Sequence, residues 1–187
     1  MLRRTKTEEL REKQVRAFVR DNVRAGLLDA TALRAEVERA VAEELPWLPP
    51  SATTDTWLAE ETREWQADAE TWQGDTDHDR LQAAFADLER AGVAVLQGCE
   101  DHWSAQALLE RRDDLVGVAW FMPSDVWHAI DEGMLEVNVW HASSANVAPG
   151  DALLDDVVAV FEGHGLSAHF DEGRIEVSAH WQRRPSG

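Results

Sequence analysis

The chain has 187 residues, of which 36 are Asp or Glu and 18 are Lys or Arg, so its formal charge is -18. Hydrophobic residues make up 44% of the sequence, which is enough for a packed core at a length typical of one domain. A single cysteine excludes a disulfide framework. No apolar run reaches the ~18 residues of a membrane span, and the first residues do not resemble a secretory signal. We therefore expect a soluble, cytoplasmic protein.

The charge is unevenly distributed along the chain. Residues 1–24 contain eight basic and four acidic side chains, a balance of +4, and residues 25–187 therefore sum to -22. Because so large a negative charge repels phosphate groups, we expect residues 25–187 to bind neither nucleic acid directly nor a membrane. The basic segment either docks on the acidic remainder of the chain or binds elsewhere, and the sequence leaves both readings open.

The first 75 residues are predicted to be largely helical. In residues 1–45 apolar side chains recur at three- and four-residue steps in two runs, the second beginning near Asp29 or Thr31, which predicts a helical hairpin. Residues 46–75 then contain a proline-bearing linker and a helix that carries several tryptophans, with N-terminal caps available at Ser51–Asp55.

Residues 76–182 alternate between helical and strand periods. This pattern predicts an α/β or α+β domain, with about five strands in a mixed sheet and helices mainly on one face. The expected elements, in chain order, are a helix capped by Asp77, strand Val93–Gln97, a helix from Trp103 to about Arg112, strand Val116–Met122, a helix from Pro123 to Glu132, strand Leu135–His141, a helix from Asp151 to Gly163 or Gly165, and strands Leu166–Phe170 and Arg174–Trp181. A turn at Glu172-Gly173 would pair Phe170 with Ile175 in the closing hairpin.

The last three strands are expected to have one apolar face and one polar face. The polar face carries the candidate binding residues Glu136, Asn138, Trp140, His169, Glu176 and His180. In the predicted hairpin register His169 faces Glu176, so the carboxylate could orient the imidazole. His180 lies about 13 Å from Glu176 along one strand, so these two cannot share an ion. The His169–Glu176 pair is either a structural cross-strand contact or the centre of a ligand-binding or general-base site.

The sequence has nine tryptophans and no tyrosine. Because adjacent residues of a strand point to opposite faces, Trp181 is expected in the core and Trp140 on the polar face. An indole on that face is either covered by the N-terminal helices, which we favour, or left as an anchor for a partner.

Cys99 and His102 have the spacing found in half of a zinc site. A second pair of ligands with similar spacing is missing, so we interpret Cys99 as an inert thiol in a surface loop and expect no metal and no cofactor. The best-known nucleotide, esterase and zinc-protease motifs are absent from the sequence as well, and we assign no catalytic residue.

Residues 76–88 contain the block T-D-x-D-R-L-x-A-A-F-x-x-L, which resembles a family of uncharacterised bacterial proteins known only as a domain of unknown function. Trp120-Phe121, Glu132 to Leu135 and the closing strand with Trp181 extend the resemblance to residue 182, and loosely to the N-terminal hairpin. The loop after the first strand is often rich in cysteine in that family, whereas only Cys99 is present here. The resemblance implies no activity.

We therefore hypothesise a non-catalytic, acidic binding or regulatory protein, inhibitor-like in character, that acts through protein–protein contacts. Its charge favours a basic protein partner. The alternative is a small enzyme or ligand-binding domain that uses the polar sheet face around His169 and Glu176. Pairing through an exposed sheet face or edge would give a homodimer, which the sequence neither requires nor excludes.

Overall fold

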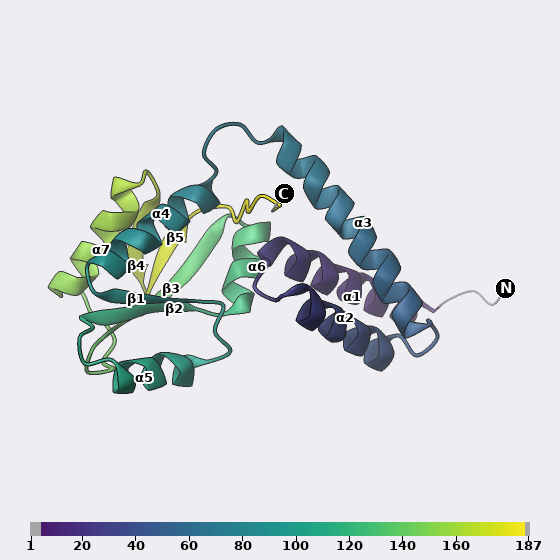
Figure 1. Ribbon diagram of the computed structural model, residues 1–187, viewed down its shortest axis with the longest axis horizontal. Coiled ribbons are helices and arrows are strands. Elements are labelled where there is room, and N and C mark those ends of the chain that lie inside the picture. Colours follow the sequence, from purple (N-terminus) through teal and green to yellow (C-terminus); the bar gives the residue numbers. More distant parts are fainter. Residues whose placement is uncertain (1–4, 186–187) are drawn as a thin grey trace. The chain divides into compact units, whose positions relative to one another are not determined.

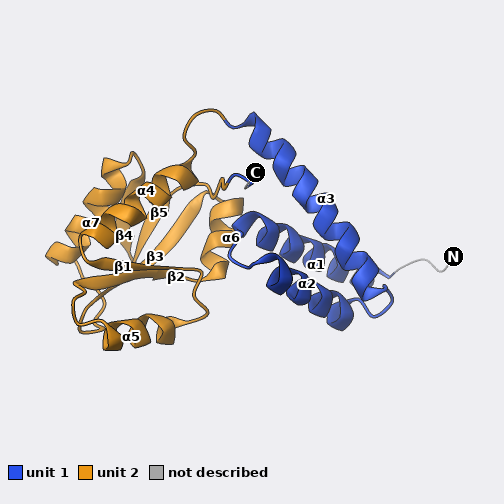
Figure 2. Ribbon diagram, viewed as in Figure 1, with its two compact units in different colours: residues 1–72, 184–187 blue, residues 73–183 orange. Residues whose placement is uncertain are grey.

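The computed structural model describes residues 5–185, which form two compact units (Figures 1 and 2). Of the described chain, residues 5–72 and 184–185 belong to unit 1, and residues 73–183 belong to unit 2. The chain thus leaves unit 1 once, forms the whole of unit 2, and then returns to unit 1.

Unit 1 consists of three helices, α1 (Lys6–Ala25), α2 (Ala30–Glu44) and α3 (Pro50–Thr71). Asp29 caps α2, as predicted, because its carboxylate accepts two backbone N–H groups of the first turn. The caps that we expected at Ser51–Asp55 are not used. Helix α3 begins instead at Pro50, whose restricted φ suits the first helical position and which lacks the N–H that a cap would satisfy.

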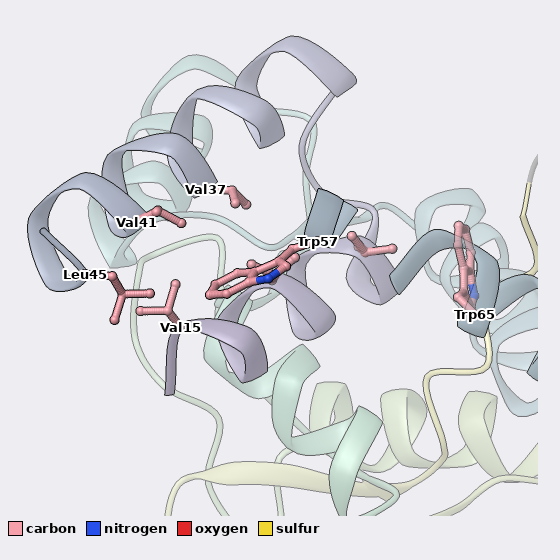
Figure 3. Packing of buried hydrophobic residues seen from close by; sticks show 8 residues of the cluster. Val15, Val37, Val41, Leu45, Trp57 and Trp65 are labelled. Atoms are coloured by element: carbon pink, nitrogen blue, oxygen red, sulfur yellow. The ribbon is translucent and has the colours of Figure 1, made fainter. Parts of the chain in front are cut away.

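The three helices of unit 1 enclose their own hydrophobic core. Trp57 of α3 lies among Val15, Val37, Val41 and Leu45 from the two other helices and the end of α2 (Figure 3). The remaining tryptophans of the region pack into or against the same cluster, namely Trp47, Trp65 and Trp72. Each buried Val or Leu of such a core contributes about 1.5–3 kcal/mol relative to exposure. Because all four tryptophans of this region belong to the cluster or pack against it, their role is structural.

Several arginines of the basic N-terminal segment are paired with acidic residues of unit 1. The Arg16 guanidinium lies 3.1 Å from the Glu60 carboxylate, and that of Arg24 lies 2.7 Å from the Asp68 carboxylate. Arg16 is also 4.3 Å from the ring centroid of Trp57, a cation–π contact. Two arginines of the basic helix are therefore paired with carboxylates of α3, next to which the helix packs. Residues 1–4 of the segment lie outside the described residues.

Unit 2 is an α/β unit with a five-stranded mixed sheet, which confirms the predicted fold class. Its elements are α4 (Asp77–Arg90), β1 (Val93–Gln97), α5 (His102–Arg111), β2 (Gly117–Phe121), α6 (Pro123–Asp131), β3 (Met134–His141), α7 (Ala152–Gly163), β4 (Ser167–Asp171) and β5 (Arg174–Ser178). The strand order is β1-β2-β3-β5-β4, in which β1 and β2 are parallel and all other neighbours are antiparallel. Helices α4 and α7 cover one face of the sheet, and α5 lies on the other (Figure 1).

The predicted pairing of the closing hairpin is confirmed, with Phe170 opposite Ile175. Strand β2, apolar on both faces, is buried along its whole length and lies inside the sheet between β1 and β3. On the face covered by α4 and α7, the ring of Phe85 packs 5.7 Å from Phe121 and 6.0 Å from Phe161. These rings join both helices to the sheet in the main core of unit 2.

Most predicted element ends in unit 2 differ from the structure by one residue at most, but the predicted cap of α4 and the predicted end of β5 were wrong. Helix α4 is capped by Thr76 rather than Asp77, in a capping box in which the Asp79 N–H donates to the Thr76 hydroxyl and the Asp79 carboxylate accepts the Thr76 N–H. Strand β5 ends at Ser178 instead of continuing to Trp181. The Trp181 N–H donates to the carbonyl of Ala129 in α6, so the chain has left the sheet there, although the indole is buried as predicted.

Candidate functional site on the open sheet face

The candidate site lies on the sheet face opposite α4 and α7. Helix α5 covers the part of this face formed by β1 and β2, through an apolar cluster that includes Ala105, Leu109 and Val118. On the part formed by β3, β5 and β4 polar side chains reach the solvent. We call this part the open sheet face and define it by Glu136, Asn138, His169, Arg174 and Glu176.

The strand register brings three of these residues into one row. Glu136 of β3 is directly opposite Glu176 of β5, which in turn is opposite His169 of β4. Two carboxylates on facing residues repel each other, at about 5 Å between Cβ atoms. The ion pair between Glu136 and Arg174 offsets this repulsion, and Glu176 Oε2 lies 3.5 Å from His169 Nε2. The predicted pairing of His169 with Glu176 is therefore confirmed.

Trp140 lies on the same sheet face but is half-buried. Its ring packs edge-on against Trp120, with 5.3 Å between centroids, and lies 6.3 Å from the ring of His102 at the start of α5. We expected the N-terminal helices to cover this indole; instead, α5 of the same unit packs against it. The apolar side of α5, which includes Ala105 and Leu109, predicts that the helix packs on a sheet but does not show on which face.

His180 does not belong to the open sheet face, although we predicted it there. Because β5 ends at Ser178, His180 lies outside the sheet, where its backbone N–H donates to the Asp77 carboxylate over 3.2 Å. Its imidazole lies against Gly133, so closely that a Cβ at that position would be 2.5 Å from the ring. The structure therefore brings together four of the six predicted residues, while Trp140 lies under α5 and His180 lies elsewhere.

Sequence reasoning missed Asp125, a buried carboxylate next to this face. It is the third residue of α6, is 8% exposed, and accepts the Met122 N–H over 2.7 Å. Burial raises the pKa of Asp125, and the charge of Glu136 raises it further. The sequence signal for the cap was available, because Asp125 is the third residue of a helix that begins with proline. Its closeness to Glu136 could not be predicted, because it depends on how α6 packs beside β3.

Cys99 is a thiol on which the Asp125 charge also acts. Its thiol is 3.6 Å from the Phe121 carbonyl, and burial raises its pKa, with the charges of Asp101 and Asp125 adding to the effect. A thiol in such surroundings stays protonated at neutral pH and is a poor nucleophile. Across residues 5–185, no three His, Cys, Asp or Glu side chains are grouped closely enough to hold a metal ion.

None of the helices in the described part of the chain is both long enough and apolar enough to cross a membrane.

Comparison with known proteins identifies a family but no activity. No curated protein and no solved structure matches the chain. The model of one family, described as a domain of unknown function (DUF6891), matches residues 7–185 and so includes both the helices of unit 1 and the sheet of unit 2. The chain therefore belongs to this family of uncharacterised domains.

Proposed function

We propose that the protein acts through protein–protein contacts, as a non-catalytic binding or regulatory protein whose unit 2 binds a basic partner. The observation that carries the proposal is the division of charge between the units. Residues 73–183 contain 21 acidic and six basic side chains, a formal charge of -15, whereas the rest of the chain has 15 acidic and 12 basic side chains, a charge of -3. Unit 2 therefore holds most of the negative charge of the protein.

The open sheet face supports this proposal because three carboxylates lie on it or at its edge, those of Glu136, Glu176 and Asp171, against one arginine, Arg174, which is paired with Glu136. The exposed fractions of the Glu136 and Glu176 side chains are 25% and 27%, and Asp171 is exposed at the edge of the same face. A surface of one predominant sign attracts a partner of the opposite sign and accelerates its association, and salt weakens this attraction.

The test is capture of partners from a native lysate by the immobilised full chain, at about 50 mM and about 500 mM salt. The double variant Glu136→Gln/Glu176→Gln removes two charges from the open sheet face. Its matched control, Asp155→Asn/Asp156→Asn, removes two charges from exposed positions of α7. We expect a basic partner that is lost at high salt and with the first variant but retained with the control. Equal retention by both variants, or no salt-sensitive basic partner, would count against the proposal.

The alternative proposal is a ligand-binding or general-base site at His169 and Glu176. The observation in its favour is the 3.5 Å pair itself, since a carboxylate that orients an imidazole is common in such sites. It has less support because the His169 side chain is 65% exposed, whereas catalytic groups usually act where water is excluded. Saturable binding of a small molecule that His169→Ala abolishes, with the fold intact, would favour this alternative.

A further inference from the structure

Trp103 is the most exposed tryptophan among the described residues. It is the second residue of α5, and 60% of its surface is accessible to solvent. The other large apolar side chains that are exposed among the described residues are aliphatic, namely Leu10, Leu28 and Val116. A tryptophan in this position suits recognition, because the indole offers a large contact area with only two rotatable bonds.

A backbone hydrogen bond and contacts with neighbouring rings restrict the movement of Trp103. Its backbone N–H donates to the Asp101 carboxylate over 3.0 Å, which fixes the first turn of α5. The His102 ring lies 4.5 Å from the Trp103 ring and 6.3 Å from Trp140, and Trp140 packs on Trp120, which is 6% exposed. A continuous series of rings thus connects the core of unit 2 to the exposed indole, so little freedom is lost when a partner binds.

Acidic side chains lie beside Trp103 and on the sheet face next to it. The exposed Asp101 carboxylate accepts the Trp103 N–H, and the neighbouring Glu100 is exposed as well. The His102 ring lies near Trp140, which is on the same face of β3 as Glu136, four residues away. A segment that extends from the indole towards the open sheet face therefore meets carboxylates, which favours a positively charged segment.

We propose that Trp103 is the anchor on which an Arg or Lys side chain of the basic partner stacks, while neighbouring cations of the same extended segment meet Asp101 and Glu136. This inference rests on the proposed function. A cation over the face of an indole is attracted when it lies within about 6 Å of the ring centroid, and tryptophan is the best of the aromatic side chains for this contact. The chain already contains one such pair, between Arg16 and Trp57.

The probe for the test is octa-arginine, with a glycine-serine peptide of the same length as the neutral control. Titration of the full chain is followed through the indole N–H signals in a nitrogen–proton correlation spectrum, and Trp103→Phe assigns the relevant signal. We expect the Trp103 signal to move most, and Trp103→Ala to raise the Kd about tenfold. Val116→Ala, which truncates another exposed apolar residue of unit 2, should leave the Kd unchanged.

The outcomes separate this inference from the proposed function. Binding that weakens with Glu136→Gln/Glu176→Gln but not with Trp103→Ala overturns the anchor and leaves the acidic surface in place. Equal losses with Trp103→Ala and Val116→Ala also overturn the anchor. Failure of octa-arginine to bind the unmodified chain at low salt overturns both. Because Trp103 is exposed, its truncation should leave the chain folded, which circular dichroism of each variant verifies.

Discussion

His78 is a histidine that the fold keeps neutral. Its ring packs edge-on against Trp181, with 4.7 Å between centroids and 79° between planes. Burial lowers its pKa from 6.5 to about 4, because an imidazolium would lose water there, and the nearby charge of Asp79 compensates only in part. At neutral pH the side chain therefore acts as an aromatic packing residue at the start of α4.

This burial predicts a pH-dependent stability. Between pH 6.5 and about 4 the unfolded chain binds a proton at His78 that the folded chain does not, so the free energy of unfolding should fall as the pH decreases through this window. Because the ring is partly solvated, we expect a loss of about 2 kcal/mol. Urea unfolding at the two ends of the window measures it. The loss should be smaller in His78→Gln by this amount, and equal losses in both proteins would contradict the prediction.

Asp125 gives a prediction of opposite sign. Its pKa is raised in the folded state, so the folded chain gains stability from this group at low pH and loses it as the pH rises through the folded pKa. At pH 7 Asp125→Asn should therefore raise the free energy of unfolding by about 1 kcal/mol, because Asn still accepts the Met122 N–H without a buried charge. The gain should vanish in acid. Asp125→Ala, which also removes the cap, should destabilise the chain at pH 7.

Strands β2 and β3 approach each other closely at one residue. A Cβ added to Gly117, the first residue of β2, would lie 2.4 Å from the backbone oxygen of Trp140 and 2.9 Å from a methyl group of Leu153. The backbone oxygen cannot move without separating the two strands. Glycine at this position therefore permits the pairing of β2 with β3, on which the position of Trp140 depends.

We expect Gly117→Ala to lower the free energy of unfolding by about 3 kcal/mol, because the added methyl group forces the strands apart. Gly163→Ala is the control: a Cβ at this helical position meets nothing within 4 Å, and alanine should stabilise α7 by up to about 1 kcal/mol. Chemical unfolding of both variants provides the comparison. Similar free energies for the two would show that the close approach at Gly117 is unimportant.

The order and type of the elements could be predicted because hydrophobic period and proline positions are local properties of the sequence. The hairpin register was also predictable, since the turn at Glu172-Gly173 determines which residues face each other. The end of β5 was not, because it depends on a hydrogen bond from Trp181 to α6. For the same reason the site was found only in part: the proximity of Asp125 to Glu136 and the cover of Trp140 by α5 arise from contacts between elements distant in sequence.

Each of the two units has a hydrophobic core of its own. The core of unit 1 is formed by α1, α2, α3 and the segment that follows α2, whereas that of unit 2 lies between the sheet and its helices. A cavity in one core removes contacts that the other core does not share. A substitution in one core should therefore lower the local stability of that unit and leave that of the other unchanged.

We predict that Val41→Ala lowers the amide protection of α1, α2 and α3 by the equivalent of about 1–2 kcal/mol while β3 and β5 keep theirs. Hydrogen exchange of the full chain, followed residue by residue, tests this. The reciprocal variant, Val137→Ala in β3, should reduce the protection of the sheet first. Loss of protection by the same amount throughout the chain would mean that both units unfold in one cooperative step.

The return of the chain to unit 1 has a consequence for biosynthesis. Arg184 and Pro185 line, with Gln66, Ala69 and Glu70 of α3, a depression of about 390 Å³. On the ribosome, α3 emerges more than a hundred residues before these two neighbours, so the helical unit begins first and acquires its last described contacts only after all five strands have been made. Unit 2 is in this sense an insertion, whose C-terminal end joins unit 1 only after all of its strands have been synthesised.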